Sequence, residues 1–422
     1  MKRSPSGIPW LAAMLTATCL TAAAQEPVPG ANVASLLDYA RAHNPEYAAM
    51  RFEAEAAGER VQPAGALPDP TLRVELMDVT NAGQAAGPNL LPGRVGSAKY
   101  TVIQPLPFWG KRDLKREVAS AEAQAAGAAA TATWVDLAAR VKASYADYYR
   151  ASVSVDLTRE ILELMAQLAQ ITQARYASGL VPQQDVLRAQ LEQTAMASEL
   201  IGMEMERHHL HSRINGLLLR PDAAPLAAPL ALRPLPALPT AAALQAQLVE
   251  HNPQLAAQRL KLAAVEKNSD LVLRNRYPDF ALGLAPTQVR SGVAEWGVML
   301  ELNLPLQQDS RRAQEREARA MVAAAEARRD ALQSQLLADL SLNLVALDAA
   351  RRTEALSRDR LRPQSELSYR AALAAYENGK LDFASLLEAQ RQIRRSRLEE
   401  LKARVEAQLR LADIERLIGE DL

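Results

Sequence analysis

The sequence is poor in several residue types, and each scarcity limits what the protein can be. Cys19 is the only cysteine, so neither an internal disulfide nor paired-thiol chemistry is expected. Aromatic residues make up only 4% of the 422 residues. The 49 basic and 49 acidic side chains balance, which argues against a nucleic-acid partner and against an acidic solvating tail. What is abundant is Ala, Leu, Glu, Gln and Arg, which favour long helices.

Long apolar runs are missing beyond residue 24. A transmembrane helix needs about 20 consecutive apolar residues, and the rest of the sequence contains no such run. We therefore expect a protein that is either periplasmic or inserted into a membrane by β-strands. The sequence also has no Gly-rich phosphate loop, no His-Glu-x-x-His motif and no Ser-His-Asp arrangement, so we predict neither an enzyme nor a cofactor.

Residues 1–24 have the pattern of a secretory signal peptide. The segment starts with two basic residues, continues with an apolar stretch at 10–20 and ends with three alanines at 22–24. The apolar stretch is too short to span a bilayer, and we predict a mature chain that begins near Gln25. Lipidation of Cys19 is the alternative, but the residues before it lack the usual leucine, so ordinary cleavage is favoured.

The remaining sequence contains an internal duplication. Residues 44–51, NPEYAAMR, return at 252–259 as NPQLAAQR, and the Pro-Asp of 67–70 returns at 277–280. Further matches lie 200 residues apart: Tyr176, Gly179, Leu187, Ala189 and Gln190 return as Tyr376, Gly379, Leu387, Ala389 and Gln390. Matches in one order at a nearly constant offset indicate gene duplication and a pseudo-two-fold subunit.

Each copy has the same predicted order of elements. A Pro-rich stretch at 221–239 is predicted to be an extended linker, so the first repeat covers 25–220 and the second 240–422. For the first repeat we predict a helix at 33–64, strands at 71–80 and 98–106, a helix at 111–177, a turn at 177–182 and a helix at 183–216. For the second we predict a helix at 240–275, strands at 280–287 and 294–305, a helix at 308–376, a turn at 377–381 and a helix at 382–418.

The predicted helix at 111–177 is unusually long. It contains no proline, and at 1.5 Å per residue it would extend for roughly 100 Å. Its apolar and small residues form two seams at 3-4 spacing, which is typical of coiled coils and predicts neighbours on both sides. The first seam is Trp134, Leu137, Val141, Ser144, Tyr148, Ala151, Val155, Thr158, Leu162 and Met165; the second is Leu157, Ile161, Leu164, Leu168 and Ile171.

The predicted strands alternate between apolar and polar residues. Residues 295–304 do so most clearly, and 280–284 and 72–76 follow the same period of two. Strands of about 9–11 residues with this pattern span outer membranes, but a membrane barrel needs at least about eight strands. Four strands per chain therefore predict an oligomer, and three subunits would supply twelve. A two-layer sheet packed on helices is the alternative.

The sequence resembles the TolC family of outer-membrane efflux factors over essentially the whole mature chain. The motifs that carry the resemblance are Asn44-Pro45-Glu46, Leu67-Pro68-Asp69-Pro70, the segment QPLPFWGKR at 104–112, and the Tyr-x-x-Gly turns at 176–179 and 376–379. The resemblance implies a mainly α protein with a membrane β-barrel part. It implies a long coiled-coil α-helical barrel and four strands per subunit, which trimerisation completes into a twelve-stranded barrel.

The resemblance also implies partners and a location. We expect a homotrimer in the bacterial outer membrane, in contact with its lipid, with a long periplasmic extension. A periplasmic adaptor (membrane fusion) protein would join it to an inner-membrane pump of the resistance-nodulation-division type. The Trp109-Gly110-Lys111-Arg112 form resembles members that serve heavy-metal pumps, so the cargo would be heavy-metal cations or drugs. A type I protein-secretion duct and a soluble periplasmic coiled-coil scaffold are the alternatives.

Two sets of site residues follow from the resemblance. The two turns would contact the adaptor through Gly179, Leu180, Val181, Gly379, Lys380 and Leu381, although both glycines could simply cap helices. Glu388 and Asp185 would line the periplasmic aperture, where Ser385 replaces an expected acid; a solvated helix face is the alternative for Glu388.

Histidines are few and carry no metal site in our interpretation. His208 and His211 could share a helix face near Met203 and Met205. A position near a helix C-terminus explains them better. His43 and His251 occupy matching repeat positions before Asn-Pro and are predicted to be structural.

Overall fold

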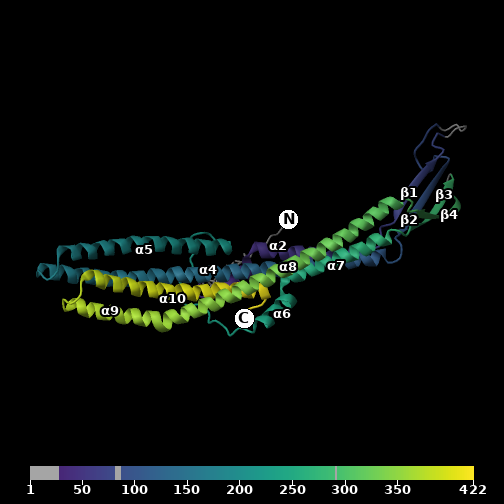
Figure 1. Cartoon of the computed structure of the whole chain (residues 1–422). Coiled ribbons are helices and arrows are strands. Elements are labelled where there is room, and N and C mark those ends of the chain that lie inside the picture. Colours follow the sequence, from purple (N-terminus) through teal and green to yellow (C-terminus); the bar gives the residue numbers. More distant parts are fainter. Residues whose placement is uncertain (1–27, 81–86, 290–291) are drawn as a thin grey trace, which may run out of the picture.

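The computed structural model describes residues 28–80, 87–289 and 292–422. It is an elongated helical bundle with a small sheet at one end (Figure 1). The predicted signal peptide, with Cys19, lies outside the described residues. Within the described part of the chain, no helix is both long and apolar enough to cross a membrane.

The elements follow the predicted order in both repeats. The first repeat contains α1 (Val33–His43), α2 (Pro45–Glu59), α3 (Val61–Ala64), β1 (Thr71–Met77), β2 (Ser97–Leu106), α4 (Lys111–Ala177) and α5 (Gln183–Leu217). The second contains α6 (Ala241–His251), α7 (Pro253–Arg274), β3 (Asp279–Val289), β4 (Gly292–Asn303), α8 (Gln308–Leu356), α9 (Arg362–Glu377) and α10 (Phe383–Ile418). The fold class predicted from the sequence, mainly helical with four strands, is confirmed.

The first predicted helix of each repeat is divided at its Asn-Pro, so the single helices expected at 33–64 and 240–275 are wrong. Asn44 and Asn252 each cap the helix that follows, accepting hydrogen bonds from Tyr47 N (3.1 Å) and Leu255 N (2.8 Å). The proline occupies the first helical position, where no N–H is needed. Each Asn amide also donates to the end of its repeat's last helix, at Leu217 O (3.2 Å) and Leu417 O (2.8 Å).

The helix predicted at 308–376 is interrupted, and that prediction is also wrong. A π-helical turn at Ser357–Leu361 separates α8 from α9, and Figure 1 shows the bend between these two helices. Pro363 lies at the start of α9. Proline lacks the N–H that would bond to the carbonyl four residues earlier, and its ring crowds that carbonyl. The helix α4 has no proline and runs unbroken for 67 residues.

Helix α4 is the centre of the bundle. It packs against α5 on one side and α10 on another, and α10 packs against α9. The first predicted seam of α4 is buried apart from half-buried Trp134 and Leu162, whereas Leu164 and Ile171 of the second seam are exposed. In the half of the bundle far from the sheet, the helices thus follow the order α5, α4, α10, α9 (Figure 1).

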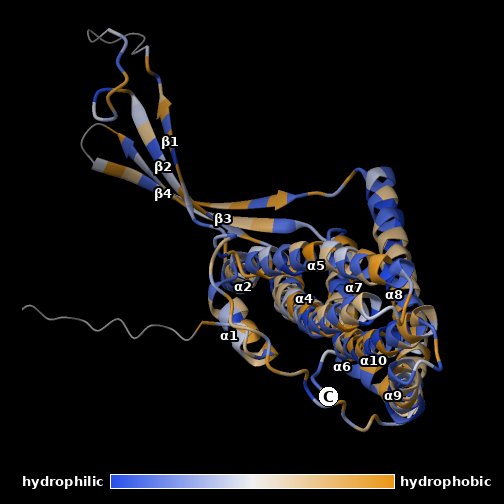
Figure 2. Cartoon of the chain, turned by 90° about the vertical axis from the view of Figure 1, so that its left-hand side faces the viewer, coloured by the Kyte–Doolittle hydropathy of each residue, from blue (hydrophilic) through white to orange (hydrophobic). Residues whose placement is uncertain are grey.

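The sheet is antiparallel with the order β1-β2-β3-β4, so the two repeats join between β2 and β3. Neighbouring residues such as Leu282 and Leu300 pair across β3 and β4. One face of the sheet is apolar and exposed, and Figure 2 shows apolar and polar residues alternating along the strands. This face carries Leu72, Val74, Val102, Leu282, Leu284, Trp296, Val298 and Leu300. The opposite face carries Arg73, Glu75, Lys99 and Glu301.

Candidate functional site at the hairpin tips

The two helical hairpins, α4–α5 and α9–α10, turn at the end of the molecule opposite the sheet (Figure 1). The two turns have the same backbone geometry, with Gly179 at φ +70° and Gly379 at φ +68°. In the first turn, Leu180 N donates to Arg175 O (2.9 Å); in the second, Lys380 N donates to Ala375 O (2.8 Å). Glycine is favoured because a side chain is strained in this left-handed conformation.

Both turns expose side chains to solvent at the end of the bundle opposite the sheet. Leu180 and Lys380 are exposed, while Val181 and Leu381 are half-buried. The space around both glycines is open: a Cβ on Gly179 would meet no atom within 4 Å, and one on Gly379 would meet only the Arg175 side chain at 3.7 Å. Neither glycine is therefore required for internal packing. The predicted contact residues lie together on an accessible surface, and their role remains a prediction.

The two tips are joined through Tyr376 by Arg175 and Thr172, two residues that the sequence did not single out. Arg175 at the end of α4 donates to the carbonyl oxygens of Tyr376 (3.0 Å) and Glu377 (2.9 Å) at the end of α9. The Thr172 hydroxyl lies 3.3 Å from the Tyr376 hydroxyl. Beneath them, the buried Tyr376 and Phe383 rings meet edge to face with centroids 5.7 Å apart. The hairpins of the two repeats therefore share one apolar core at their tips.

The two predicted aperture residues have different surroundings. Glu388 is exposed on α10, whereas Asp185 is only 9% exposed in the first turn of α5. Ser385 is exposed and its backbone N–H donates to the Asp382 carboxylate (3.1 Å) that caps α10. Glu388 and Ser385 therefore lie on an accessible face of the second hairpin, while Asp185 packs inside the first. The aperture assignment itself remains a prediction.

A row of ion pairs connects α10 with α5 and with α4, farther along the bundle from the tips. Arg391 binds Glu192 at 2.5 Å, Arg394 binds Glu199, and Arg397 binds Glu160 at 3.4 Å. The hydrogen bond from Arg391 holds the pKa of Glu192 below its ordinary value, and the same bond, aided by nearby Glu388, raises the pKa of Arg391. Sequence reasoning missed these pairs because their members are roughly 200 residues apart and only tertiary packing joins them.

The histidines of α5 lie farther from the tips. His208 and His211 stack with ring centroids 6.1 Å apart, and burial lowers the pKa of His211, with His208 adding to the effect. Because α5 continues to Leu217 with no basic residue in its last turn, the expected helix-terminus explanation is wrong. Among the described residues, no group of three or more His, Cys, Asp and Glu side chains is placed to hold a metal ion.

The histidines before the two Asn-Pro pairs have different partners. His43 stacks on Tyr39 at 4.3 Å between ring centroids, and its Nδ1 lies 3.2 Å from the Tyr39 carbonyl oxygen. His251 Nδ1 instead lies 2.8 Å from a carboxylate oxygen of Glu420. Both contacts are within the chain, and each holds the end of a short helix.

Comparison with known proteins gives one family and several solved structures. The sequence pattern of a family described as outer membrane efflux protein matches residues 36–214 and 244–420. A membrane protein from Pseudomonas aeruginosa is 20% identical with a TM-score of 0.78, covering 93% of this chain and 91% of its own. The outer membrane protein VceC from Vibrio cholerae is 17% identical with a TM-score of 0.78, covering 92% and 96%. No curated protein matches the sequence significantly.

A third solved structure is the open state of the MtrE outer membrane channel from Neisseria gonorrhoeae. It is 17% identical with a TM-score of 0.74, covering 92% of this chain and 89% of its own. The TM-scores of 0.74–0.78 demonstrate a shared fold, and the family pattern spans both repeats. The resemblance to the TolC family that the sequence motifs predicted is confirmed, together with the outer-membrane location.

Proposed function

The chain belongs to the outer membrane efflux protein family, and from that premise we propose that it is one subunit of a homotrimeric, passive export duct. A periplasmic adaptor protein would hold the hairpin tips, and an inner-membrane pump of the resistance-nodulation-division type would supply the energy. The proposed cargo is heavy-metal cations or drugs. The observation that carries the proposal is a pair of apolar helix edges that one chain leaves uncovered.

The first uncovered edge lies on α5 and the second on α8 and α9. Leu187 and Leu191, and farther along α5 Ile201 and Met205, are exposed, and the two residues of each pair are four positions apart. Leu342, Val345, Leu356 and Leu367 are exposed along α8 and α9. Helices α5 and α9 are the outermost helices of the row α5, α4, α10, α9 (Figure 1), so Leu191 on α5 and Leu367 on α9 belong to helices at opposite ends of that row. Contact between unlike edges of neighbouring copies is the arrangement that closes a ring.

The sheet supports the same assembly. Its edge strands, β1 and β4, each have one partner strand among the described residues, and its apolar face is exposed. Unpaired backbone groups in lipid cost several kcal/mol each, so a four-stranded sheet in a membrane needs further strands at both edges. Two more copies would supply them and give twelve strands, with charged Arg73, Glu75 and Lys99 on the lumen side.

The proposal can be tested at the helix edges. Leu191 and Leu367 are 70% and 63% exposed, so Leu191→Glu and Leu367→Glu should leave the chain folded but reduce trimer recovered from outer membranes. Gln190→Glu, one position along α5 and also exposed, is the matched control. The measurement is the mass of the detergent-solubilised particle by light scattering. A monomeric wild-type protein in the soluble periplasm would overturn the duct and favour the scaffold alternative.

The tip residues define the adaptor contact in this proposal. Gly179, Leu180 and Val181 in one turn, and Gly379, Lys380 and Leu381 in the other, would meet the adaptor, and Glu388 with Asp185 would border the aperture. A cysteine at Leu180 should cross-link to a co-expressed adaptor, whereas a cysteine at exposed Phe52 on α2 should not. Efflux that survives Gly379→Trp with unchanged adaptor binding would remove the second turn from the contact.

A further inference from the structure

A hollow of about 500 Å³ lies where the sheet meets the start of α4. Its lining comes from strand residues, from the segment between β2 and α4 and from the first turn of α4. Its lining includes Leu106, Trp109, Arg112, Asp113, Leu282 and Leu300. The lining thus combines aliphatic and aromatic surface with one cation and one anion.

The position of the hollow leaves it open in the proposed trimer. Leu106 and Leu282 belong to β2 and β3, the two middle strands of the sheet, whereas Leu300 belongs to the edge strand β4. New strands would add at β1 and β4, so they would not cover these middle strands. Leu282 pairs with Leu300 and lies two residues from Leu284 on the exposed apolar face. The hollow is therefore continuous with the surface that faces lipid in the proposed function.

Aromatic rings form the wall at the helix end. Phe108 stacks on Tyr277 with ring centroids 4.5 Å apart. The ring centroids of Trp109 and Phe280 are 5.7 Å apart. Trp109 is largely exposed although it is held between neighbouring rings. Exposed tryptophan and tyrosine are favoured where hydrocarbon gives way to headgroups, because one part of each ring system is apolar and another can hydrogen-bond.

Two opposite charges stand next to each other at this wall. Arg112 is fixed by a hydrogen bond from Nε to Gly65 O (2.9 Å), which orients its guanidinium while other N–H groups remain to bind an anion. Asp113 follows it on α4, with an exposed Arg116 3.5 Å away as its ion-pair partner. That exposed contact is weak, so the Asp113 carboxylate remains accessible to a ligand ammonium.

We propose that this hollow binds one phospholipid molecule with an amine headgroup, at the periplasmic leaflet. An acyl chain would lie along Leu282 and Leu300, the phosphate would accept hydrogen bonds from Arg112, and the ammonium would meet Asp113. This rests on the proposed function, because it requires the apolar face to meet lipid. A site over the middle strands would fix how deeply each subunit sits in the membrane.

Lipid titration of the purified trimer tests the proposal, with bound lipid counted by native mass spectrometry. The probes are dioleoyl phosphatidylethanolamine and dioleoyl phosphatidylglycerol. Leu282→Trp fills the hollow, and Leu284→Trp is its control because the two leucines are 48% and 50% exposed on one face. The first variant should bind phosphatidylethanolamine about tenfold more weakly, a loss of about 1.4 kcal/mol, while the control should match the wild type.

The headgroup contacts are tested with Asp113→Asn and Arg112→Gln. Asp113→Asn should abolish the preference for phosphatidylethanolamine over phosphatidylglycerol, and Arg112→Gln should weaken the binding of both. Equal weakening by Leu282→Trp and Leu284→Trp would indicate a general lipid shell and overturn the site. An unchanged headgroup preference in Asp113→Asn would overturn the amine assignment. A wild-type protein that forms no trimer would contradict the proposed function before any lipid is added. Failure of the proposed function can therefore be told apart from failure of the lipid site.

Discussion

The guanidinium of Arg175 lies 5.0 Å from the centroid of the Tyr376 ring and donates a hydrogen bond to the carbonyl oxygen of the same residue. It thereby joins the last turn of α4 in the first repeat to the last turn of α9 in the second. The position equivalent to Arg175 in the second repeat is Ala375, so this contact has no duplicate. The two turns therefore share their backbone geometry but differ in their side-chain contacts.

Removing this contact should loosen the second tip. Arg175→Ala deletes two hydrogen bonds and the ring contact, and each hydrogen bond contributes about 1 kcal/mol. Amide hydrogen exchange at 376–380 should therefore be about fivefold faster or more, with little change near the sheet. Arg188→Ala, which removes an exposed cation from α5, is the control. Equal exchange in the two variants would contradict a locking role for Arg175.

The two glycine environments in the first hairpin predict opposite effects of the same substitution. Gly179 has a φ of +70°, so Gly179→Ala should destabilise the hairpin by about 1 kcal/mol. Gly127 lies inside α4, where an added Cβ would meet no atom within 4 Å, so Gly127→Ala should stabilise by about 0.5–1 kcal/mol. Thermal unfolding of the two variants side by side measures the difference. A matching sign for both changes would contradict the turn geometry.

Much of this architecture follows from residues that act locally. The Tyr-x-x-Gly turns take the left-handed conformation, and the proline-free segment at 111–177 forms one helix. Each of these depends on a few neighbouring residues, so sequence patterns reveal it. The alternation of residues 295–304 likewise predicts the exposed apolar face of β4.

Other features depend on which segments come together. We predicted one helix through Pro363, whereas a π-helical turn at Ser357–Leu361 separates α8 from α9 just before that proline. The Arg391–Glu192 pair and the burial of Asp185 both require the packing of α5 in its place in the bundle. Neither feature follows from local sequence. The duplication does not reveal them either, because Asp185 corresponds to Ser385 and Glu192 to Gln392 in the second repeat.

The pair between Arg391 and Glu192 predicts acid sensitivity at the tips. The pKa of the Glu192 carboxyl is lowered from 4.5 mainly by its hydrogen bond from Arg391. A carboxyl with a lowered pKa in the folded state stabilises the fold above its ordinary pKa, and this stabilisation is lost as pH falls through the lowered value. The loss should be about 0.5–1 kcal/mol because Arg391 is partly exposed.

This pH effect can be assigned with one substitution. Glu192→Gln should reduce stability at pH 7 and show a smaller further loss at about pH 3 than the wild type. Glu163→Gln, which changes an exposed carboxylate on α4, should keep the wild-type pH dependence. The measurement is hydrogen exchange of α5 and α10 at both pH values. Identical pH profiles for wild type and Glu192→Gln would contradict the assignment.

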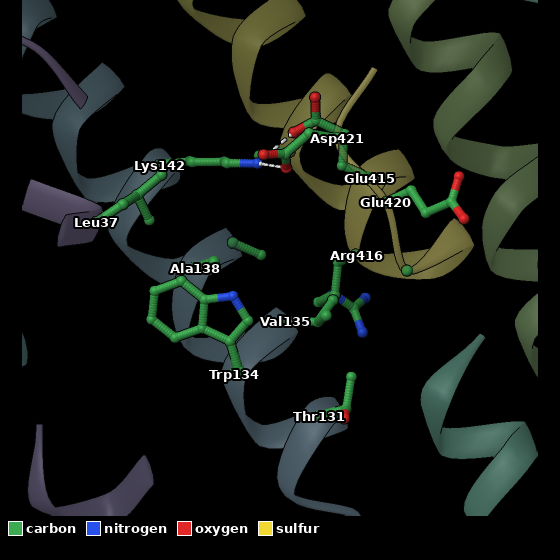
Figure 3. Close-up of a pocket in the computed structure, with 13 residues that line it drawn as sticks. Leu37, Thr131, Trp134, Val135, Ala138, Lys142, Glu415, Arg416, Glu420 and Asp421 are labelled. Atoms are coloured by element: carbon green, nitrogen blue, oxygen red, sulfur yellow. Dashed lines mark hydrogen bonds and ion pairs between the residues drawn. The ribbon is translucent and has the colours of Figure 1, made fainter. Parts of the chain in front are cut away.

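Among the residues that the structure describes, Glu415 on α10 is the most deeply buried charged residue, and Lys142 on α4 reaches it within the bundle (Figure 3). The Glu415 side chain is 2% exposed, and Lys142 Nζ lies 2.7 Å from its carboxylate. Arg233 of the linker between the repeats binds the same carboxylate through two N–H groups, both at 2.7 Å. Asp421 also contacts Lys142, but its side chain is 76% exposed. One carboxylate therefore holds together α4, α10 and the linker.

Substitution of these two acids should have very different consequences. Glu415→Ala leaves two cations without their buried partner, which costs about 3–5 kcal/mol in comparable sites. Asp421→Ala removes an exposed partner of the same lysine and should cost less than about 1 kcal/mol. The apparent melting temperature of the detergent-solubilised protein, followed by circular dichroism, compares them. Equal shifts would mean that Arg233 and Lys142 find other acids or water, and that the linker is held by its apolar contacts instead.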